Sequence, residues 1–164
     1  MAVSPQMQTK LDKIDALVKD GYTLSKSRGF ISLKNSHGKD VNIFGGFLSF
    51  SGPAGFSWIA FFFAPIVCAQ IKEKSFFNLL CVLTLIETVA SILFNIEISV
   101  GGLLLSFLYA NMFPYYRYMA VKDGVEELPK VTSIVLSIIY SIAALIPSFA
   151  LAFIYALIRA SLSQ

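Results

Sequence analysis

The stretch VTSIVLSIIYSIAALIPSFALAFIYALI (131–158) decides the class of this protein, because it runs for 28 residues without a charge. As a straight helix it would be about 42 Å long, whereas about 20 apolar residues already cross the hydrocarbon core of a bilayer. Pro147 lies near its middle, which leaves either one tilted and kinked span or a helical hairpin. We favour the kinked span, and the sequence therefore predicts an integral membrane protein.

Three further apolar segments precede this stretch, and they complete a predicted all-α membrane bundle over 56–164. They are the segments 56–71, 76–94 and 98–114. The segment 76–94 is long enough to cross a bilayer, but 56–71 is short and contains Pro65. It either spans or enters the membrane only in part. We therefore expect three to four transmembrane helices.

The first 46 residues are polar and predict a small α+β cap. A helix is expected over 8–20, because its apolar residues recur at helical spacing. These residues are Leu11, Ile14, Leu17 and Val18. Over 30–44, two short runs of alternating apolar residues flank a turn at 35–38, which predicts a β-hairpin. Residues 47–55 are rich in Gly, Ser and Phe and are interpreted as a linker.

Composition argues against several classes of function. Charged residues make up 14% of the chain, against about 25% in soluble domains, and a net charge of +3 is too small to indicate a nucleic-acid partner. His37 is the single histidine, and neither Cys68 nor Cys81 stands in a metal-binding spacing. We therefore expect no metal, no cofactor and no catalysis.

The basic residues predict an orientation. If 56–71 does not span, most membrane-proximal cations lie on the same side as the N-terminus, and only Arg159 lies opposite. The cations on the N-terminal side are Lys72, Lys74, Arg117, Lys122 and Lys130. The positive-inside rule then predicts a multi-pass protein of the inner membrane with a cytoplasmic N-terminus.

Two polar residues inside the apolar segments are candidate functional residues. Glu87 lies near the middle of 76–94, where a carboxylate is costly unless it is protonated, paired or hydrated. It is either a proton or cation site, or a structural group bonded to Ser91, Tyr109 or Asn111. Asn111 itself is interpreted as a hydrogen-bonding residue between helices.

A second set of candidates is expected at the lipid interface, where amphipathic aromatic and basic side chains gather. The set consists of Trp58, Tyr115, Tyr116, Arg117, Tyr118 and Lys122. It forms either a general aromatic belt or, with Lys122, a lipid-headgroup site.

The runs FSWIAFFFAPIVCAQIKEKSFFNLL (56–80) and GGLLLSFLYANMFPYYRY (101–118) carry a family resemblance. Over 56–120 the chain resembles an uncharacterised family of small bacterial membrane proteins, of the domain-of-unknown-function 2628 type. It departs from that family's pattern at Val67 and Cys68, where an aromatic residue is expected. The resemblance implies a helical membrane fold and brings no known activity.

Size and the absence of a catalytic motif favour a function in binding. The leading hypothesis is an accessory or immunity-type protein that binds another membrane protein within the lipid bilayer. One alternative is a small oligomeric unit, built from copies of this chain, that transports or senses an ion or proton through Glu87. A second alternative is a lipid-binding envelope protein.

Overall fold

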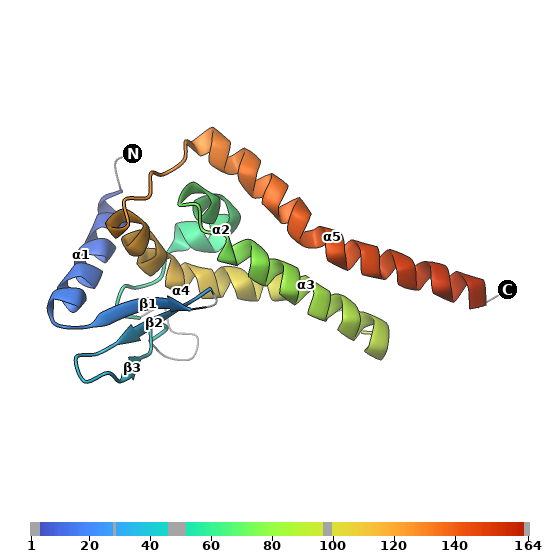
Figure 1. Cartoon of the computed structure of the whole chain (residues 1–164), viewed down its shortest axis with the longest axis horizontal. Helices are drawn as coiled ribbons and strands as arrows, with labels where there is room; N and C mark the ends of the chain where they lie inside the picture. Colours follow the sequence, from blue (N-terminus) through green and yellow to red (C-terminus); the bar gives the residue numbers. More distant parts are fainter. Residues whose placement is uncertain (1–3, 28, 46–51, 97–99, 163–164) are drawn as a thin grey trace.

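The computed structural model describes residues 4–27, 29–45, 52–96 and 100–162. Within these residues the chain is mostly helical, with one small sheet. In order the elements are α1 (Pro5–Lys19), β1 (Thr23–Ser27), β2 (Phe30–Lys34), β3 (Asp40–Val41), α2 (Trp58–Gln70), α3 (Ser75–Phe94), α4 (Gly101–Lys122) and α5 (Lys130–Leu162). Figure 1 shows α1 and the sheet gathered at one end, which we call the cap end, with α3 and α5 extending away from it.

The cap helix α1 begins three residues before the predicted range. Ser4 caps its start, since the Ser4 hydroxyl accepts a hydrogen bond from the Met7 backbone N–H at 3.3 Å, and Pro5 occupies the first turn, where no N–H partner is needed. The buried stripe of Met7, Leu11 and Ile14 packs into the core. The apolar spacing recognised in the sequence is therefore the face that α1 buries.

The sheet has three antiparallel strands in the order β1-β2-β3. The predicted hairpin corresponds to β2 and β3, and the Asn35 side chain holds its turn by accepting from the His37 and Lys39 backbone N–H groups at 3.0 Å each. The sequence prediction missed β1, which pairs along the whole of β2. The residues of β1 are TLSKS, and their lack of apolar alternation gave no strand signal.

The helix α2 is too short to cross a bilayer. Its 13 residues extend about 20 Å, against a hydrocarbon core of about 30 Å. Pro65 lies inside it, and Phe63 has non-helical backbone angles, as expected where a proline removes a helical hydrogen bond. Of the predicted linker, residues 47–51 lie outside the described part of the chain, whereas Ala54 is buried.

A proline also shapes α4, which continues to Lys122 and so extends beyond the predicted end at 114. Pro114 has no N–H to donate to the Ala110 carbonyl, four residues earlier. That carbonyl instead accepts from the Ser57 backbone N–H at 2.9 Å, and Ser57 also caps α2. The carbonyl that Pro114 leaves free therefore anchors the start of α2 to α4.

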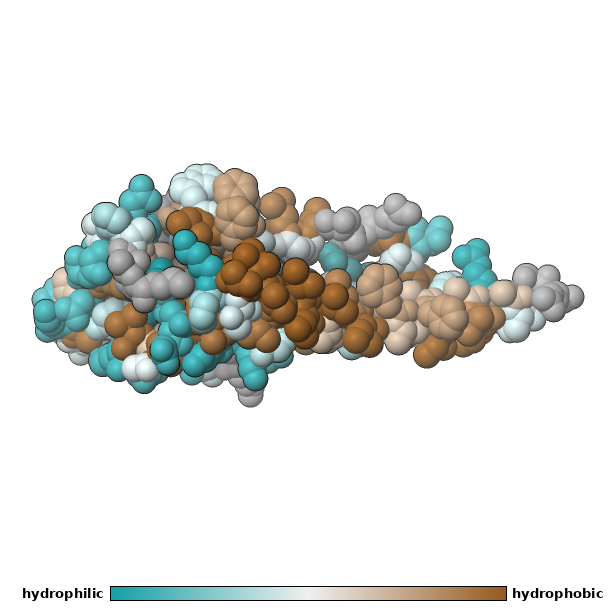
Figure 2. Space-filling view, turned by 90° about the horizontal axis from the view of Figure 1, so that it is seen from above, coloured by the Kyte–Doolittle hydropathy of each residue, from teal (hydrophilic) through white to brown (hydrophobic). Residues whose placement is uncertain are grey.

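Two helices, rather than the three or four expected, are long and apolar enough to cross a membrane: α3 and α5. The structure shows α5 as a single helix across Pro147, with a change of direction near its middle, so the hairpin alternative is wrong. Only 11% of the apolar window in α3 and 17% of that in α5 is buried. Figure 2 shows the consequence, a polar surface at the cap end and a hydrophobic surface along the extended part of the molecule.

Candidate functional site

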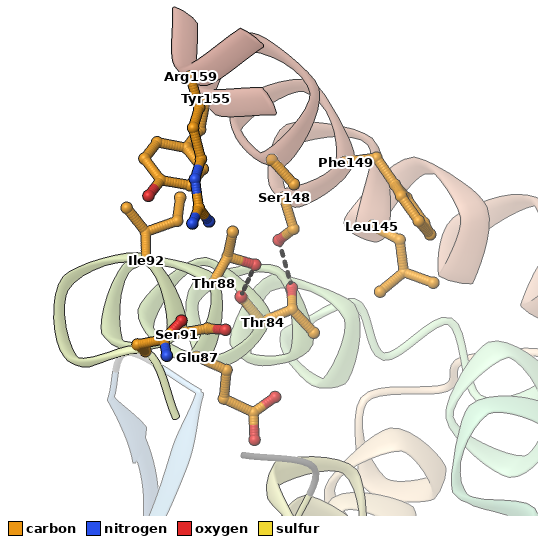
Figure 3. A pocket seen from close by; sticks show the side chains of 12 residues that line it. Thr84, Glu87, Thr88, Ser91, Ile92, Leu145, Ser148, Phe149, Tyr155 and Arg159 are labelled. Atoms are coloured by element: carbon orange, nitrogen blue, oxygen red, sulfur yellow. Dashed lines mark hydrogen bonds between the residues drawn. The ribbon is translucent and has the colours of Figure 1, made fainter. Parts of the chain in front are cut away.

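A cleft of about 570 Å³ lies between α3 and α5, in the apolar part of the molecule (Figure 3). Its walls carry hydrophobic residues such as Leu145 and Phe149, and also a row of polar side chains. The polar lining includes Thr84, Thr88, Ser91, Ser148, Tyr155 and Arg159. A hydrophilic cleft is thus embedded in the two helices that are apolar enough to span a membrane.

One hydrogen bond joins the two walls of the cleft, and a second lies within α3. The Ser148 hydroxyl of α5 donates to the Thr84 hydroxyl of α3 at 2.9 Å, and the Thr88 hydroxyl donates to the Thr84 carbonyl at 2.8 Å. Tyr155 and Arg159 lie near Ile92, toward the ends of both helices (Figure 3). The two helices therefore run in parallel, and the cation marks the end of the cleft that is remote from the cap.

The sequence interpretation missed this cleft, although one signal was present. Thr84, Thr88 and Ser91 stand at i, i+4 and i+7, which places all three hydroxyls on one face of a helix. The spacing does not reveal which element packs against that face. Only the packing of α3 on α5 brings Ser148 and Arg159 opposite to it.

Glu87 contributes to the cleft wall, but its carboxylate is engaged elsewhere. Its Oε1 accepts a hydrogen bond from the Gly101 backbone N–H at 2.8 Å, and Figure 3 shows the carboxylate pointing away from α5. A carboxylate at the first residue of a helix satisfies a free N–H and complements the helix dipole. Glu87 therefore acts as a cap for α4, and its bond partner is this backbone group rather than the expected Ser91, Tyr109 or Asn111.

Asn111 is 1% exposed and does not join two helices through a described hydrogen bond. Its amide nitrogen donates to the Phe107 carbonyl of its own helix at 2.9 Å. Its amide oxygen is buried, and within the described part of the chain it has no partner. The expected bond between helices is not what the structure shows.

Two of the six interface candidates, Tyr115 and Tyr116, bind the cap instead of facing lipid, which corrects the expectation for them. Tyr115 and Tyr116 are buried. The Tyr115 hydroxyl accepts from the Ala54 backbone N–H at 3.2 Å, and the Tyr116 hydroxyl donates to the Gly29 carbonyl. Buried phenols cannot contact lipid headgroups.

Arg117 and Tyr118 also have partners within the protein, but neither is fully buried, so their contact with lipid stays a prediction. Arg117 pairs with Glu127 of the α4–α5 connection at 2.6 Å, and both side chains are largely buried. The Tyr118 hydroxyl donates to Asp15 of α1 at 3.1 Å, a carboxyl whose pKa is lowered mainly by the Lys19 ammonium beside it. The sequence analysis assigned these polar groups to the lipid interface. In the fold they join segments of the chain to one another.

The remaining two interface candidates lie at the surface. Trp58 is 57% exposed at the start of α2, with its ring edge-on to Phe56 at a centroid distance of 5.0 Å. Lys122 is exposed at the end of α4. Their contact with lipid stays a prediction.

In the part of the chain that the structure describes, no group of three His, Cys, Asp or Glu side chains is placed to hold a metal ion. Comparison with protein-family models, curated proteins and solved structures found no match to this chain. The family resemblance over 56–120 therefore stays a prediction.

Proposed function

We propose that this chain is a multi-pass protein of the bacterial inner membrane that acts, without catalysis, by binding another membrane protein along α3 and α5. The observation that carries the proposal is the polar cleft between these helices. Accessory and immunity-type proteins are the classes that we favour, since both act by contact alone. The resemblance to small bacterial membrane proteins is consistent with this assignment.

The polar lining of the cleft calls for a polar partner. Hydroxyl and guanidinium groups are costly to expose to lipid, and in membrane proteins they are commonly satisfied by polar groups of a neighbouring helix. Ser148 and Thr84 satisfy one another, and Arg159 lines the end of the cleft that is remote from the cap. A partner helix with polar side chains on one face would complete these bonds while its apolar residues cover Phe149 and Leu145.

The arrangement of charges supports a cytoplasmic N-terminus. Lys72 and Lys74 precede α3, Lys122 ends α4 and Lys130 begins α5, and Figure 1 places all these helix ends at the cap end. Arg159 lies toward the other end of α5. With α3 and α5 crossing in the same direction, α4 returns the chain through the same layer, its polar residues enclosed by neighbouring helices. This distribution satisfies the positive-inside rule.

The test is photocrosslinking in native membranes from a benzoylphenylalanine placed at Ala152, which lines the cleft. The matched control position is Ile154, which is exposed on the same helix but lies outside the cleft lining. We expect one protein partner, identified by mass spectrometry, from position 152 and not from 154. Arg159→Gln should lower its recovery about threefold to tenfold, the effect of one interhelical hydrogen bond. Equal recovery from both positions would contradict the proposal.

The transport alternative makes a different prediction. If only this chain is recovered, as a defined oligomer, a unit that uses Glu87 becomes the better explanation. Glu87→Gln should then abolish proton-coupled activity, whereas partner binding through the cleft should survive it. The present geometry favours binding, because the Glu87 carboxylate is bonded to the start of α4.

A further inference from the structure

A basic pocket of about 570 Å³ lies at the cap end, where α3 begins. Three lysines line it, Lys26 from β1 and Lys72 and Lys74 from the α2–α3 connection, together with Glu73. Lys26 is paired with Glu73 at 2.6 Å. Among the described residues no carboxylate forms an ion pair with Lys72 or Lys74. Both lysines are exposed, and the Lys74 ammonium also lies 5.9 Å from the centre of the Tyr140 ring of α5. The pocket is thus lined by two cationic side chains without a carboxylate partner, which attract an anion.

An apolar groove of about 170 Å³ continues from this pocket along α3 and α4. The two hollows share Leu79 and Val82 in their walls, so they adjoin. The groove is almost purely hydrophobic, and further along it Ile86 and Leu104 are more than half exposed. A charged pocket and an apolar groove in contact make one amphipathic site.

The depth of the two parts matches the profile of a bilayer. Lys72 and Lys74 come just before the first residue of α3, at the level where a spanning helix meets the headgroups. Leu79 and Ile86 lie four and eleven residues beyond Ser75, which is about 6 and 16 Å further along the helix. The charges therefore lie at headgroup level and the groove at acyl-chain level.

We propose that this site binds one anionic phospholipid of the cytoplasmic leaflet, with its phosphate at Lys72 and Lys74 and an acyl chain in the groove along Leu79, Val82 and Ile86. The Lys26–Glu73 pair and the bond from Tyr116 to Gly29 fix the sheet beside α3, and so hold the pocket in shape. The proposal rests on membrane insertion, as the proposed function does, but requires no protein partner. The lipid site and the polar cleft lie on different surfaces of α3.

The test is native mass spectrometry of the full chain purified in detergent and titrated with dioleoyl-phosphatidylglycerol. We expect one lipid to bind tightly, and dioleoyl-phosphatidylcholine to bind at least tenfold more weakly. K72Q/K74Q should weaken phosphatidylglycerol binding about 30-fold, the loss expected for two interfacial lysines. The matched control K34Q/K39Q removes two exposed lysines at the far end of β2 and its turn, and should bind as the unaltered chain does.

Further measurements distinguish lipid binding from the binding of free phosphate, and a loss of binding from a folding defect. Dioctanoyl-phosphatidylglycerol should bind more weakly than the dioleoyl lipid, because it fills less of the groove. Inorganic phosphate that competes as well as the lipid would overturn the proposal in favour of a headgroup-only site. K72R/K74R keeps both charges and should restore binding, which excludes a folding defect as the cause of the loss. Equal binding of the two dioleoyl lipids would also overturn it, whatever the result of crosslinking at Ala152.

Discussion

Tyr115 and Phe153 are large aromatic side chains in helices of one chain, yet Tyr115 is fully buried and Phe153 is 65% exposed. Tyr115 belongs to the cap end, where α1, the sheet, α2 and the second half of α4 pack together. Phe153 belongs to the extended arm formed by α3 and α5. At the cap end, polar groups such as Arg117 find partners inside the protein, whereas most of the apolar surface of the arm is left uncovered.

This difference indicates that the two regions are suited to different surroundings, the cap end to water and the arm to an apolar medium. Fully burying a large apolar side chain contributes about 1.5–3 kcal/mol to the stability of the fold. At the cap end this burial takes place within the protein. The arm leaves residues such as Ile138, Ile146 and Phe149 uncovered. In water such a surface would aggregate, but in a bilayer the acyl chains supply the missing contacts. The arm therefore requires lipid or a partner helix.

The sharpest test of this contrast is truncation of one aromatic residue in each region. Phe113→Ala, in the buried part of α4, should lower the free energy of unfolding by about 3–5 kcal/mol through the cavity it leaves. Phe153→Ala should change it by less than about 0.5 kcal/mol, as at exposed sites. Unfolding of the detergent-solubilised protein by SDS, followed by circular dichroism, measures both. Similar losses would show that the arm is packed and would break the comparison.

A second test addresses the polar contacts of the cap end. Arg117→Gln removes the cation beside the Glu127 carboxylate, which is 12% exposed and, among the described residues, then keeps only the neutral Gln70 amide as a donor. The substitution should cost about 3 kcal/mol in the same unfolding assay. R117Q/E127Q should recover part of that loss. The control is Lys19→Gln, which removes an ion pair with Asp15 that is exposed to solvent, and should have little effect. A large loss in this control would mean that burial is not what distinguishes the two pairs.

The smallest expected effect concerns the start of α4, which is the end of that helix remote from the cap. A Cβ on Gly101 would lie 2.5 Å from Glu87 Oε1 and 2.8 Å from a Leu83 methyl group, whereas one on Gly102 meets nothing within 4 Å. Gly101→Ala should cost about 1–2 kcal/mol, and Gly102→Ala should instead stabilise the helix by about 0.5 kcal/mol. Equal effects in the unfolding assay would argue against Glu87 as the cap of α4.

Local patterns in the sequence determined the cap helix, the β2–β3 hairpin and the two apolar helices α3 and α5. In each case the signal lies within one element: the spacing of Leu11 and Ile14, the turn at 35–38, or an uncharged run long enough to cross a bilayer. Such signals need no knowledge of neighbours, because the period of the helix or strand alone sets which face is apolar.

Only the tertiary structure decided what the polar residues do. Glu87 looked like a buried charge until the start of α4 was placed beside it, and the tyrosines of α4 looked like a lipid belt until the cap was packed over them. A hydrogen bond such as that from Tyr116 to Gly29 joins residues 87 positions apart, and no periodicity encodes such a pairing. The apolar face of a helix or strand can be recognised from the sequence of that element alone. A buried polar group instead needs one particular hydrogen-bond partner, which only the fold supplies.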